Sequence, residues 1–347
     1  MDYSVTTIFP DDAYAQAQMG KLLAQSGLCK DGNLDYSCGI FDQEEALIAT
    51  GSCFGNTLRC LAVSQDHQGE GLLNEILSHL IEVQMARGNS HLFLYTKPAS
   101  AKFMEDLGFR EIARVPGKAV FMENRRTGFD QYCRQLSEKR VEGQRIAGVV
   151  MNANPFTLGH LHLVEQAARE NDVVHLFVLS EEAGPIPFAV RKKLVMDGIG
   201  QLSNVICHDS GPYIISSATF PSYFLKDGDA VIETQAALDL QVFGKIAAVL
   251  GIQRRYVGQE KSSHVTALYN AVMKQNLPKQ GIQCVEIPRL QVEGQVVSAS
   301  TVRQAVHDGQ LETVRNFLPQ STYAYFAGPE GAAVTAAIRA EKNVIHY

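Results

Sequence analysis

Apolar and polar positions in the first third of the chain follow two different periods, which predict strands mixed with helices. Leu73, Ile76, Leu77 and Leu80 recur at the spacing of one helix face. Short apolar runs bounded by polar turns predict strands. The predicted strands are 46–54, 57–64 and His91 to Thr96, and the predicted helices are 71–86 and a short one that ends at Leu107-Gly108. We therefore expect an α+β domain here.

Beyond residue 145 the chain alternates regularly between apolar runs and amphipathic segments. The run Ile146 to Met151 precedes a predicted helix over 158–170. Further predicted strands are Val173 to Leu179, 205–208, 230–232, 255–258 and 284–287. Alternating strands and helices favour a parallel sheet with helices on both faces. We expect a Rossmann-like, doubly wound α/β domain.

A polar, charge-rich segment separates the two patterns. Residues 126–144 read RTGFDQYCRQLSEKRVEGQ, and Phe129, Cys133 and Leu136 within them have helical spacing, which predicts a connecting helix. The expected domains are 1–125 and 145–347. The length agrees, since 347 residues at roughly 150 per domain suggest two domains.

Composition narrows the class of protein. Apolar residues make up 46% and charged residues 20%, an ordinary globular balance. The formal net charge of −6 does not favour nucleic-acid binding. No apolar run is long enough to span a membrane, and the acidic N-terminus does not resemble a signal peptide. Seven scattered cysteines without a CxxC pair are typical of reduced thiols rather than disulfides or a zinc site, so we expect a cytoplasmic protein.

The segment Asn152 to His160, NANPFTLGH, joins the first apolar run of the second half to its helix. The first strand-to-helix turn of a doubly wound sheet is a favoured ligand site. Gly159 allows close approach of a phosphate, and the helix start offers free N–H groups. His160 would project from the first helical turn, where a ring N–H can reach a phosphate oxygen. A metal pair with His162 is not expected, because residues two apart on a helix point to nearly opposite faces.

A second polar cluster lies about 140 residues further on, in VSASTVR. Ser300 is the predicted N-cap of a helix over 301–308, which Gly309 closes. Ser298, Ser300, Thr301 and Arg303 would gather hydroxyls and a guanidinium at that helix start. Such a cluster suits a triphosphate.

These two segments resemble the paired motifs of the nucleotidyltransferase superfamily. Thr157-Leu-Gly-His160 is similar to T/HxGH, and Ser298-Ala-Ser-Thr-Val-Arg303 is similar to ISSTxVR. Either alone usually marks only a turn or a helix cap, but the pair in this order is specific. The resemblance implies adenylyl transfer from ATP with Mg²⁺, with His160, Arg303 and Thr157 as catalytic residues. Thr157 departs from the commoner histidine.

The resemblance also implies which residues contact ATP. The expected ATP contacts are Asn152, Asn154, Pro155, Phe156, Gly159, Ser298, Ser300 and Thr301. Three less specific segments follow predicted strands or open a helix. Arg191 begins a helix after a proline-rich loop and is expected at the phosphates, although such residues more often face solvent. Gly258 and Glu260 end a predicted strand and are expected at the same edge, and Gly211 to Ser217 is expected to border the acyl site.

The first half carries a different glycine-rich loop, Asp66-His-Gln-Gly69-Glu-Gly71, before the helix 71–86. It resembles the pyrophosphate-binding motif of GNAT acetyltransferases, R/QxxGxG/A, and the stretch from Ala101 to Phe109 resembles their following helix. The resemblance implies that a coenzyme A-like arm is bound at Gln68, Gly69, Glu70 and Gly71. Two positions depart from it: Asp66 replaces Arg or Gln, and Met104 replaces the usual acid tyrosine.

Across nearly its whole length the chain resembles the citrate lyase ligase family, through MNANPFTLGHLHLVEQA, GPYIISSATFPSYFLKD and VSASTVRQAV. That family consists of acid–thiol ligases that activate acetate as acetyl-AMP. They then acetylate the thiol of a dephospho-coenzyme A-like prosthetic group on the citrate lyase acyl carrier subunit. The resemblance implies acetate and this subunit as partners.

Three other functions stay open at this point. One is an adenylyltransferase that acts on a phosphopantetheine or mononucleotide substrate. Another is a non-catalytic sensor of acyl-CoA and nucleotide. The third is a protein acetyltransferase with an accessory domain, which Met104 disfavours.

Overall fold

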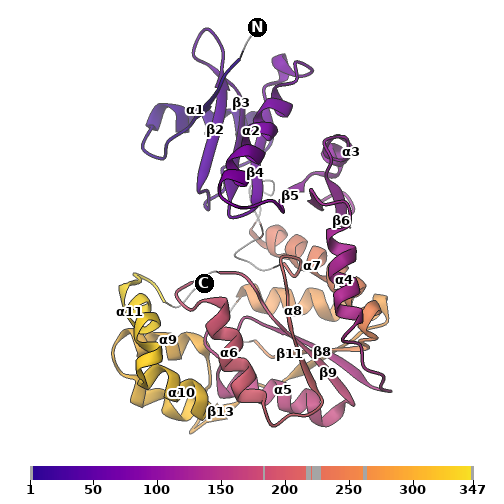
Figure 1. Ribbon diagram of the computed structural model, residues 1–347, viewed down its shortest axis with the longest axis vertical. Coiled ribbons are helices and arrows are strands. Elements are labelled where there is room, and N and C mark those ends of the chain that lie inside the picture. Colours follow the sequence, from indigo (N-terminus) through magenta and orange to yellow (C-terminus); the bar gives the residue numbers. More distant parts are fainter. Residues whose placement is uncertain (1–2, 183, 216–219, 221–227, 261–263, 345–347) are drawn as a thin grey trace. The chain divides into compact units, whose positions relative to one another are not determined.

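The computed structural model describes residues 3–182, 184–215, 220, 228–260 and 264–344 (Figure 1). The chain forms two compact units. The first comprises Met1–Asp130 with Phe220–Leu238, and the second comprises Gln131–Thr219 with Asp239–Tyr347. The segment Phe220–Leu238 thus groups with the first unit, although Gln131–Thr219 of the second unit precede it along the chain.

The first unit is a single sheet with helices, as the α+β prediction required. Its elements are β1 (Val5–Thr7), α1 (Ala13–Gln25), β2 (Tyr36–Phe41), β3 (Leu47–Phe54), β4 (Thr57–Val63), α2 (Leu72–Ala86), β5 (Phe93–Thr96), α3 (Pro98–Asp106), β6 (Arg110–Val115) and β7 (Ala119–Glu123). The strand order is β1-β2-β3-β4-β5-β7-β6. Helix α4 (Gly128–Ser137) follows, within the segment where a connecting helix was expected.

Strands β4 and β5 form the one parallel pair of the first sheet among the described residues. They pair only at Thr57 with Phe93 and at Leu58 with Leu94, so the rest of β4 has no partner in β5. Helix α2 provides the crossover that a parallel pair needs. The loop between β4 and α2 carries the glycine-rich motif. This half is an α+β unit, the fold class that the sequence predicted.

The second unit contains a five-stranded parallel sheet in the order β10-β9-β8-β11-β12. Its first elements are β8 (Ile146–Met151), α5 (Leu158–Glu170), β9 (Val173–Val178), α6 (Phe188–Ile199), β10 (Val205–Asp209), the part of α7 (Gly228–Leu250) from Asp239 onward, β11 (Arg254–Gly258), α8 (His264–Asn276) and β12 (Gln283–Ile287). A hairpin and three helices complete it: β13 (Gln291–Val292), β14 (Gln295–Val296), α9 (Ala299–His307), α10 (Gln320–Ala327) and α11 (Ala332–Ala340).

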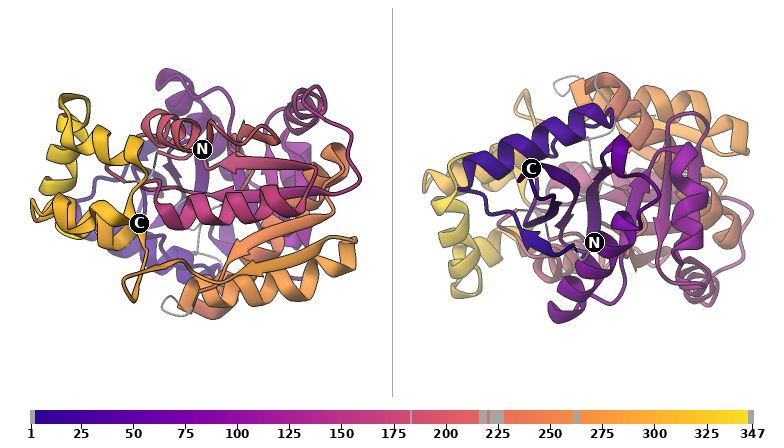
Figure 2. Two further views of the ribbon diagram at one scale, coloured as in Figure 1. Left: turned by 90° about the horizontal axis from the view of Figure 1, so that it is seen from below. Right: turned by 90° about the horizontal axis from the view of Figure 1, so that it is seen from above.

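Helices cover both faces of this sheet, which confirms the doubly wound prediction. Ala147 and Val149 of β8 pack in one apolar core with Val164 of α5. Gly148 lies between them and faces the other side, because successive strand residues alternate in direction. A Cβ at Gly148 would stand 3.0 Å from the Phe243 ring of α7. The last three helices, coloured yellow in Figures 1 and 2, lie side by side, and their buried side chains belong to the same apolar core as β8.

One predicted strand, 230–232, is wrong, because these residues lie inside helix α7. The run Ala230-Val231-Ile232 is apolar but too short for its period to distinguish a strand from a buried helix turn. The 23 residues of α7 have the length and the Ala and Leu content of a helix. No helix in the described part of the chain is long and apolar enough to cross a membrane.

Candidate active site

The order of the parallel strands points to one edge of the second sheet. The chain goes from β8 to β9 and β10 on one side, then returns to β11 and β12 on the other. Ligands of doubly wound sheets bind beyond the carboxyl ends of the strands where this order reverses. The loops after β8 and β11 meet this condition. They are Asn152 to Thr157 and the segment from Gln259 onward.

Helix α5 begins with the predicted T/HxGH motif, and the motif caps the helix. The Thr157 hydroxyl accepts a hydrogen bond from the His160 backbone N–H at 3.4 Å. The backbone N–H of Thr157 donates to Nδ1 of His160 at 3.1 Å, and the Thr157 hydroxyl lies 2.9 Å from the same nitrogen. This reciprocal pattern is a capping box in which histidine takes the place of Glu or Gln.

The cap determines which ring nitrogen of His160 carries the proton. Because Nδ1 accepts a backbone N–H, a neutral ring must carry its proton on Nε2. Burial, together with the positive charges of Arg289 and Arg303, lowers the pKa of His160 to about 4. Near neutral pH the ring is therefore an uncharged donor with its N–H on the side away from the cap.

Aromatic packing orients the same ring. The Phe156 ring is fully buried and stacks on His160, with 5.9 Å between the centroids and 18° between the planes. A Cβ at Gly198 of α6 would come within 2.4 Å of the Phe156 ring. Gly198 therefore leaves the space that Phe156 occupies beneath His160.

The second motif opens helix α9, but its N-cap is Ser298 and not Ser300 as predicted. Ser298 has extended backbone angles, and its hydroxyl accepts from the Thr301 N–H at 3.1 Å. A residue at the N-cap needs both features, whereas Ser300 already lies within the helix. The Ser298 hydroxyl lies 3.0 Å from that of Ser300 and 2.8 Å from that of Thr301. Gly309 follows the helix in the left-handed conformation, as predicted.

The two motifs, far apart in sequence, are in direct contact. The Arg303 side chain of α9 is 6% exposed, and its guanidinium donates to the backbone carbonyl of Asn154. Its Nε donates to the carbonyl of Val344 at 2.6 Å. A Cβ at Gly159 would stand 3.4 Å from the Val297 carbonyl, so glycine permits this close approach. Arg303 therefore holds the loop of the first motif as well as bringing charge near His160.

Asn154 itself contains an unsatisfied polar group. Its side-chain oxygen and nitrogen are buried and have no hydrogen-bond partner among the described residues. A buried amide without partners costs roughly 1–3 kcal/mol. Such a group in a native structure indicates a position that a ligand or an ordered water completes.

Arg191 lies in a different environment from the one that the sequence suggested. Its side chain is fully buried beneath the loops, neither facing solvent nor reaching outward. Nη1 donates to the carbonyls of Asn152 and Leu179 and to the Asn152 side-chain oxygen, at 2.8–2.9 Å. The carbonyls of Glu181 and Ile186 accept from the other guanidinium nitrogens. In this structure Arg191 joins the segments that follow β8 and β9.

Gly258 ends β11, and Glu260 lies two residues further on, at the predicted edge. The Glu260 carboxylate forms an ion pair with Arg289, a residue that the sequence analysis did not select. Arg289 occupies the corresponding position after β12, two residues beyond its end. That spacing from the strand end was the only sequence signal for it. The segment Gly211 to Ser217 is described only as far as Ile215, so Ser216 and Ser217 lie outside the described residues.

The glycine-rich loop of the first unit lies where the motif predicted, between β4 and α2. Gln68, Gly69, Glu70 and Gly71 are all exposed. Gly71 is the N-cap of α2 in the left-handed conformation, with φ +82°, and Gly69 has φ +91°. Met104 packs in the core of this unit, so its side chain has a structural role.

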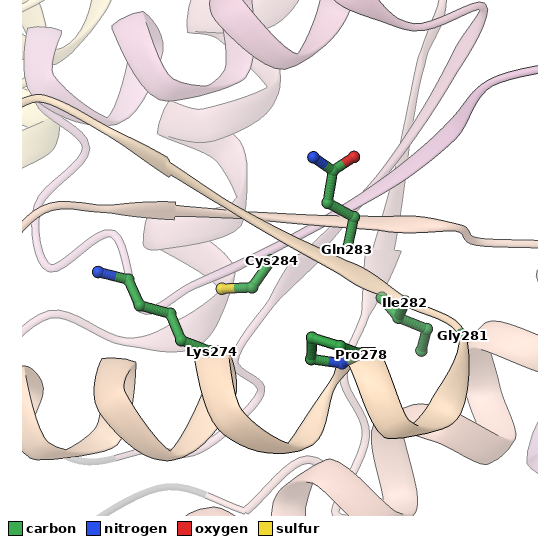
Figure 3. A pocket seen from close by; sticks show the side chains of 6 residues that line it. All are labelled: Lys274, Pro278, Gly281, Ile282, Gln283 and Cys284. Atoms are coloured by element: carbon green, nitrogen blue, oxygen red, sulfur yellow. The ribbon is translucent and has the colours of Figure 1, made fainter.

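A hollow of about 440 Å³ lies elsewhere on the second unit (Figure 3). Its walls come from the end of α8, the turn after it and the first half of β12. This is the amino end of the strand, opposite to the motifs, and none of the predicted site residues lines it. Among the described residues, no group of three or more His, Cys, Asp or Glu side chains is placed to hold a metal ion.

Comparison with known proteins identifies the family. Residues 146–326 match the family model described as the citrate lyase ligase C-terminal domain. The citrate (pro-3S)-lyase ligase of Klebsiella pneumoniae is 40% identical over 291 residues, covering 82% of this chain and 85% of the relative. That of Haemophilus influenzae is 36% identical over 311 residues, covering 87% and 92%.

A solved acyl-CoA N-acyltransferase from Pseudomonas aeruginosa covers 36% of this chain and 100% of its own, at 11% identity and a TM-score of 0.31. A score this low adds nothing to the strand topology described above. The curated relatives, in contrast, match most of both chains at more than a third identity. The chain therefore belongs to the citrate lyase ligase family and is a ligase.

Proposed function

We propose that this ligase activates acetate with ATP and transfers the acetyl group to the prosthetic-group thiol of the citrate lyase acyl carrier subunit. In the first step an acetate oxygen attacks the α-phosphorus of ATP. The bond between that phosphorus and the oxygen bridging to the β-phosphate breaks, and pyrophosphate leaves. In the second step the thiolate attacks the acetyl carbonyl carbon, and AMP leaves.

The observation that carries the proposal is the meeting of the two motifs at the edge where the strand order reverses. His160 offers an uncharged Nε2–H to phosphate oxygens whose negative charge grows as pyrophosphate departs. The hydroxyls of Ser298, Ser300 and Thr301 gather at the start of α9, where helix N–H groups favour anions. The positive charge of Arg303 lies close enough to His160 to lower its pKa.

ATP enters as its Mg²⁺ complex in this scheme, so the metal ion arrives with the substrate. Phosphate oxygens and water provide most of the ligands that Mg²⁺ prefers. The buried Asn154 amide is placed in the loop at Asn152 to Phe156 and can complete its hydrogen bonds with a ligand. We assign the ATP contacts to this loop, Thr157, Gly159 and the α9 hydroxyls.

We propose a separate task for the first unit, which is to bind the coenzyme A-like arm of the carrier subunit through its pyrophosphate. The exposed loop Gln68 to Gly71 ends at the N-terminus of α2, whose free N–H groups suit phosphate oxygens. Met104 is buried in the core. Its thioether has no acidic proton, so it cannot protonate a departing thiolate. This fits a reaction in which the thiol attacks and does not leave.

The deciding experiment is ATP–pyrophosphate exchange with Mg²⁺, with and without acetate, on the purified chain. Exchange that depends on acetate supports carboxylate adenylation, and deacetylated citrate lyase is then the acceptor to test. Exchange that needs a phosphopantetheine or mononucleotide product instead would identify a plain adenylyltransferase. No turnover of ATP under any of these conditions would leave a binding protein.

The two glycines of the β4–α2 loop provide a test of the division of labour. Both have positive φ, so alanine at either position strains the loop even though no atom lies within 4 Å of a new Cβ. We expect Gly69→Ala and Gly71→Ala to reduce acetylation of the carrier thiol by about tenfold or more, a loss of roughly 1.4 kcal/mol or more of binding free energy. Acetate-dependent exchange should persist in both variants.

Gly117→Ala is the matched control, because Gly117 has φ +71°, equally open space and a place in the turn between β6 and β7. It should leave both activities unchanged. Loss of exchange together with thiol acetylation in the Gly69 and Gly71 variants would disprove the separation of the two steps.

A further inference from the structure

The position of Arg289 places it beside the two motifs. Gly258 of β11 pairs with Ile287 of β12 in parallel register, and the Gln259 N–H donates to the Ile287 carbonyl at 2.8 Å. Glu260 and Arg289 each stand two residues beyond this pair. Both therefore lie past the carboxyl edge of the sheet, on the β11 side of the point where the strand order reverses.

Two nitrogens of the Arg289 guanidinium are held by hydrogen bonds, and the side chain is partly exposed. Nε donates to the Gln259 carbonyl at 3.0 Å, and one Nη donates to the Glu260 carboxylate. The Glu260 side chain is 5% exposed, whereas that of Arg289 is 32% exposed. The second Nη has no hydrogen-bond partner among the residues that the structure describes. A buried carboxylate thus orients a guanidinium that remains accessible to a ligand.

The chain after Arg289 leads directly to the phosphate-binding hydroxyls. Leu290 accepts a hydrogen bond from the Val297 N–H at 3.0 Å, which closes the base of the β13–β14 hairpin. Ser298 follows Val297 as the cap of α9, and Gly159 abuts the Val297 carbonyl. Arg289, the hydroxyl cluster and the start of α5 are therefore brought together. The effect of the Arg289 charge on His160 is consistent with this placement.

We propose that Arg289 binds the β- and γ-phosphates of ATP and the departing pyrophosphate, and that Glu260 is the positioning residue that holds its guanidinium. This inference rests on the proposed function, since it names the cation for the leaving group of the adenylation step. It also changes the role expected for Glu260, whose carboxylate repels phosphate when it stands alone. A planar guanidinium matches two phosphate oxygens at once, which a lysine cannot do.

The test compares ATP and AMP, because AMP lacks the two phosphates that Arg289 is assigned to bind. Arg289→Ala should raise the KM for ATP and for pyrophosphate in exchange by about 10- to 100-fold, the effect of losing a charged hydrogen bond. The KM for acetate and the Kd for AMP, measured by calorimetry, should stay unchanged. Arg289→Lys, which keeps the charge without the fork, should lie between the two.

Arg169→Ala is the matched control, since Arg169 lies exposed in the last turn of α5, far along that helix from His160. It should bind ATP like the unaltered chain. Thermal midpoints verify that each variant folds. If Arg289→Ala and Arg289→Lys bind ATP as well as Arg169→Ala does, the assignment of Arg289 is wrong.

The role of Glu260 is tested by replacing it in the unaltered chain and in the Arg289→Ala variant. Glu260→Gln should weaken ATP binding several-fold in the unaltered chain and have no further effect in Arg289→Ala, because it acts through Arg289. An equal further loss in Arg289→Ala would overturn the assignment of Glu260 as a positioning residue.

If the unaltered chain prefers ATP to AMP through Arg289 but shows no acetate-dependent exchange, the proposed function fails and the phosphate site stands. If the unaltered chain does not bind ATP, both fail.

Discussion

Replacing His160 with alanine is expected to reduce acetate-dependent ATP–pyrophosphate exchange by roughly 10²- to 10³-fold, the usual cost of removing one donor to a developing negative charge. The physical reason is the assignment of the ring proton. Nδ1 is occupied by the backbone N–H of Thr157, so Nε2–H is the donor available to phosphate. The fall should appear in kcat more than in the KM for ATP, since the charge develops in the transition state.

Alanine also removes the acceptor that caps the Thr157 N–H, so a second variant must separate capping from catalysis. His160→Asn places an amide oxygen near the position of Nδ1 and lacks the distal N–H. We expect its thermal midpoint to exceed that of His160→Ala, since a cap is worth about 1 kcal/mol. Its exchange rate should stay as low as that of the alanine variant.

His162→Ala provides the control within the same helix. His162 lies two residues on, so it points to a different side of α5. Its replacement should leave exchange unchanged. Normal exchange in His160→Asn would remove the imidazole N–H from the mechanism, whatever the alanine variant does.

The helices and strands that the sequence predicted correctly share one property, which is an apolar pattern that extends over several residues. The helix 158–170 and the strand Ile146 to Met151 occur within the predicted bounds. The run 230–232 misled because three apolar residues carry no period of their own, and the 23-residue helix around them decided the conformation. The grouping of Phe220–Leu238 with the first unit depends on contacts between distant segments, which no local pattern contains.

The candidate site shows the same limit at the level of single side chains. His160 could be selected from the sequence because the Thr157-Leu-Gly-His160 motif predicts that it lies in the first turn of a helix. Arg289 could not, since its significance depends on the parallel register of β11 and β12 and on the carboxylate of Glu260. A basic residue near a strand end is common, and only the structure shows which one is oriented by a buried acid.

Arg191 illustrates the opposite case, in which a charge that looked available for phosphates is fully enclosed. Its guanidinium donates to four backbone carbonyls and to the Asn152 side chain. Burial lowers the pKa of Arg191, while the nearby carboxylates of Glu181 and Glu182 act in the opposite direction. Truncation would leave these carbonyls buried without donors, and each such group costs roughly 1–3 kcal/mol.

We expect Arg191→Met to lower the free energy of unfolding by about 3–5 kcal/mol, the scale for breaking a buried charged network. For a unit of this size the thermal midpoint should fall by about 10 °C or more. Exchange should fall with it at all ATP concentrations, because the loop at Asn152 to Phe156 loses its anchor to the segment after β9.

Arg169→Ala, which removes an exposed arginine, should change neither quantity. A variant that keeps its thermal midpoint and shows only a raised KM for ATP would instead place Arg191 at the phosphates, as its position in the sequence first suggested.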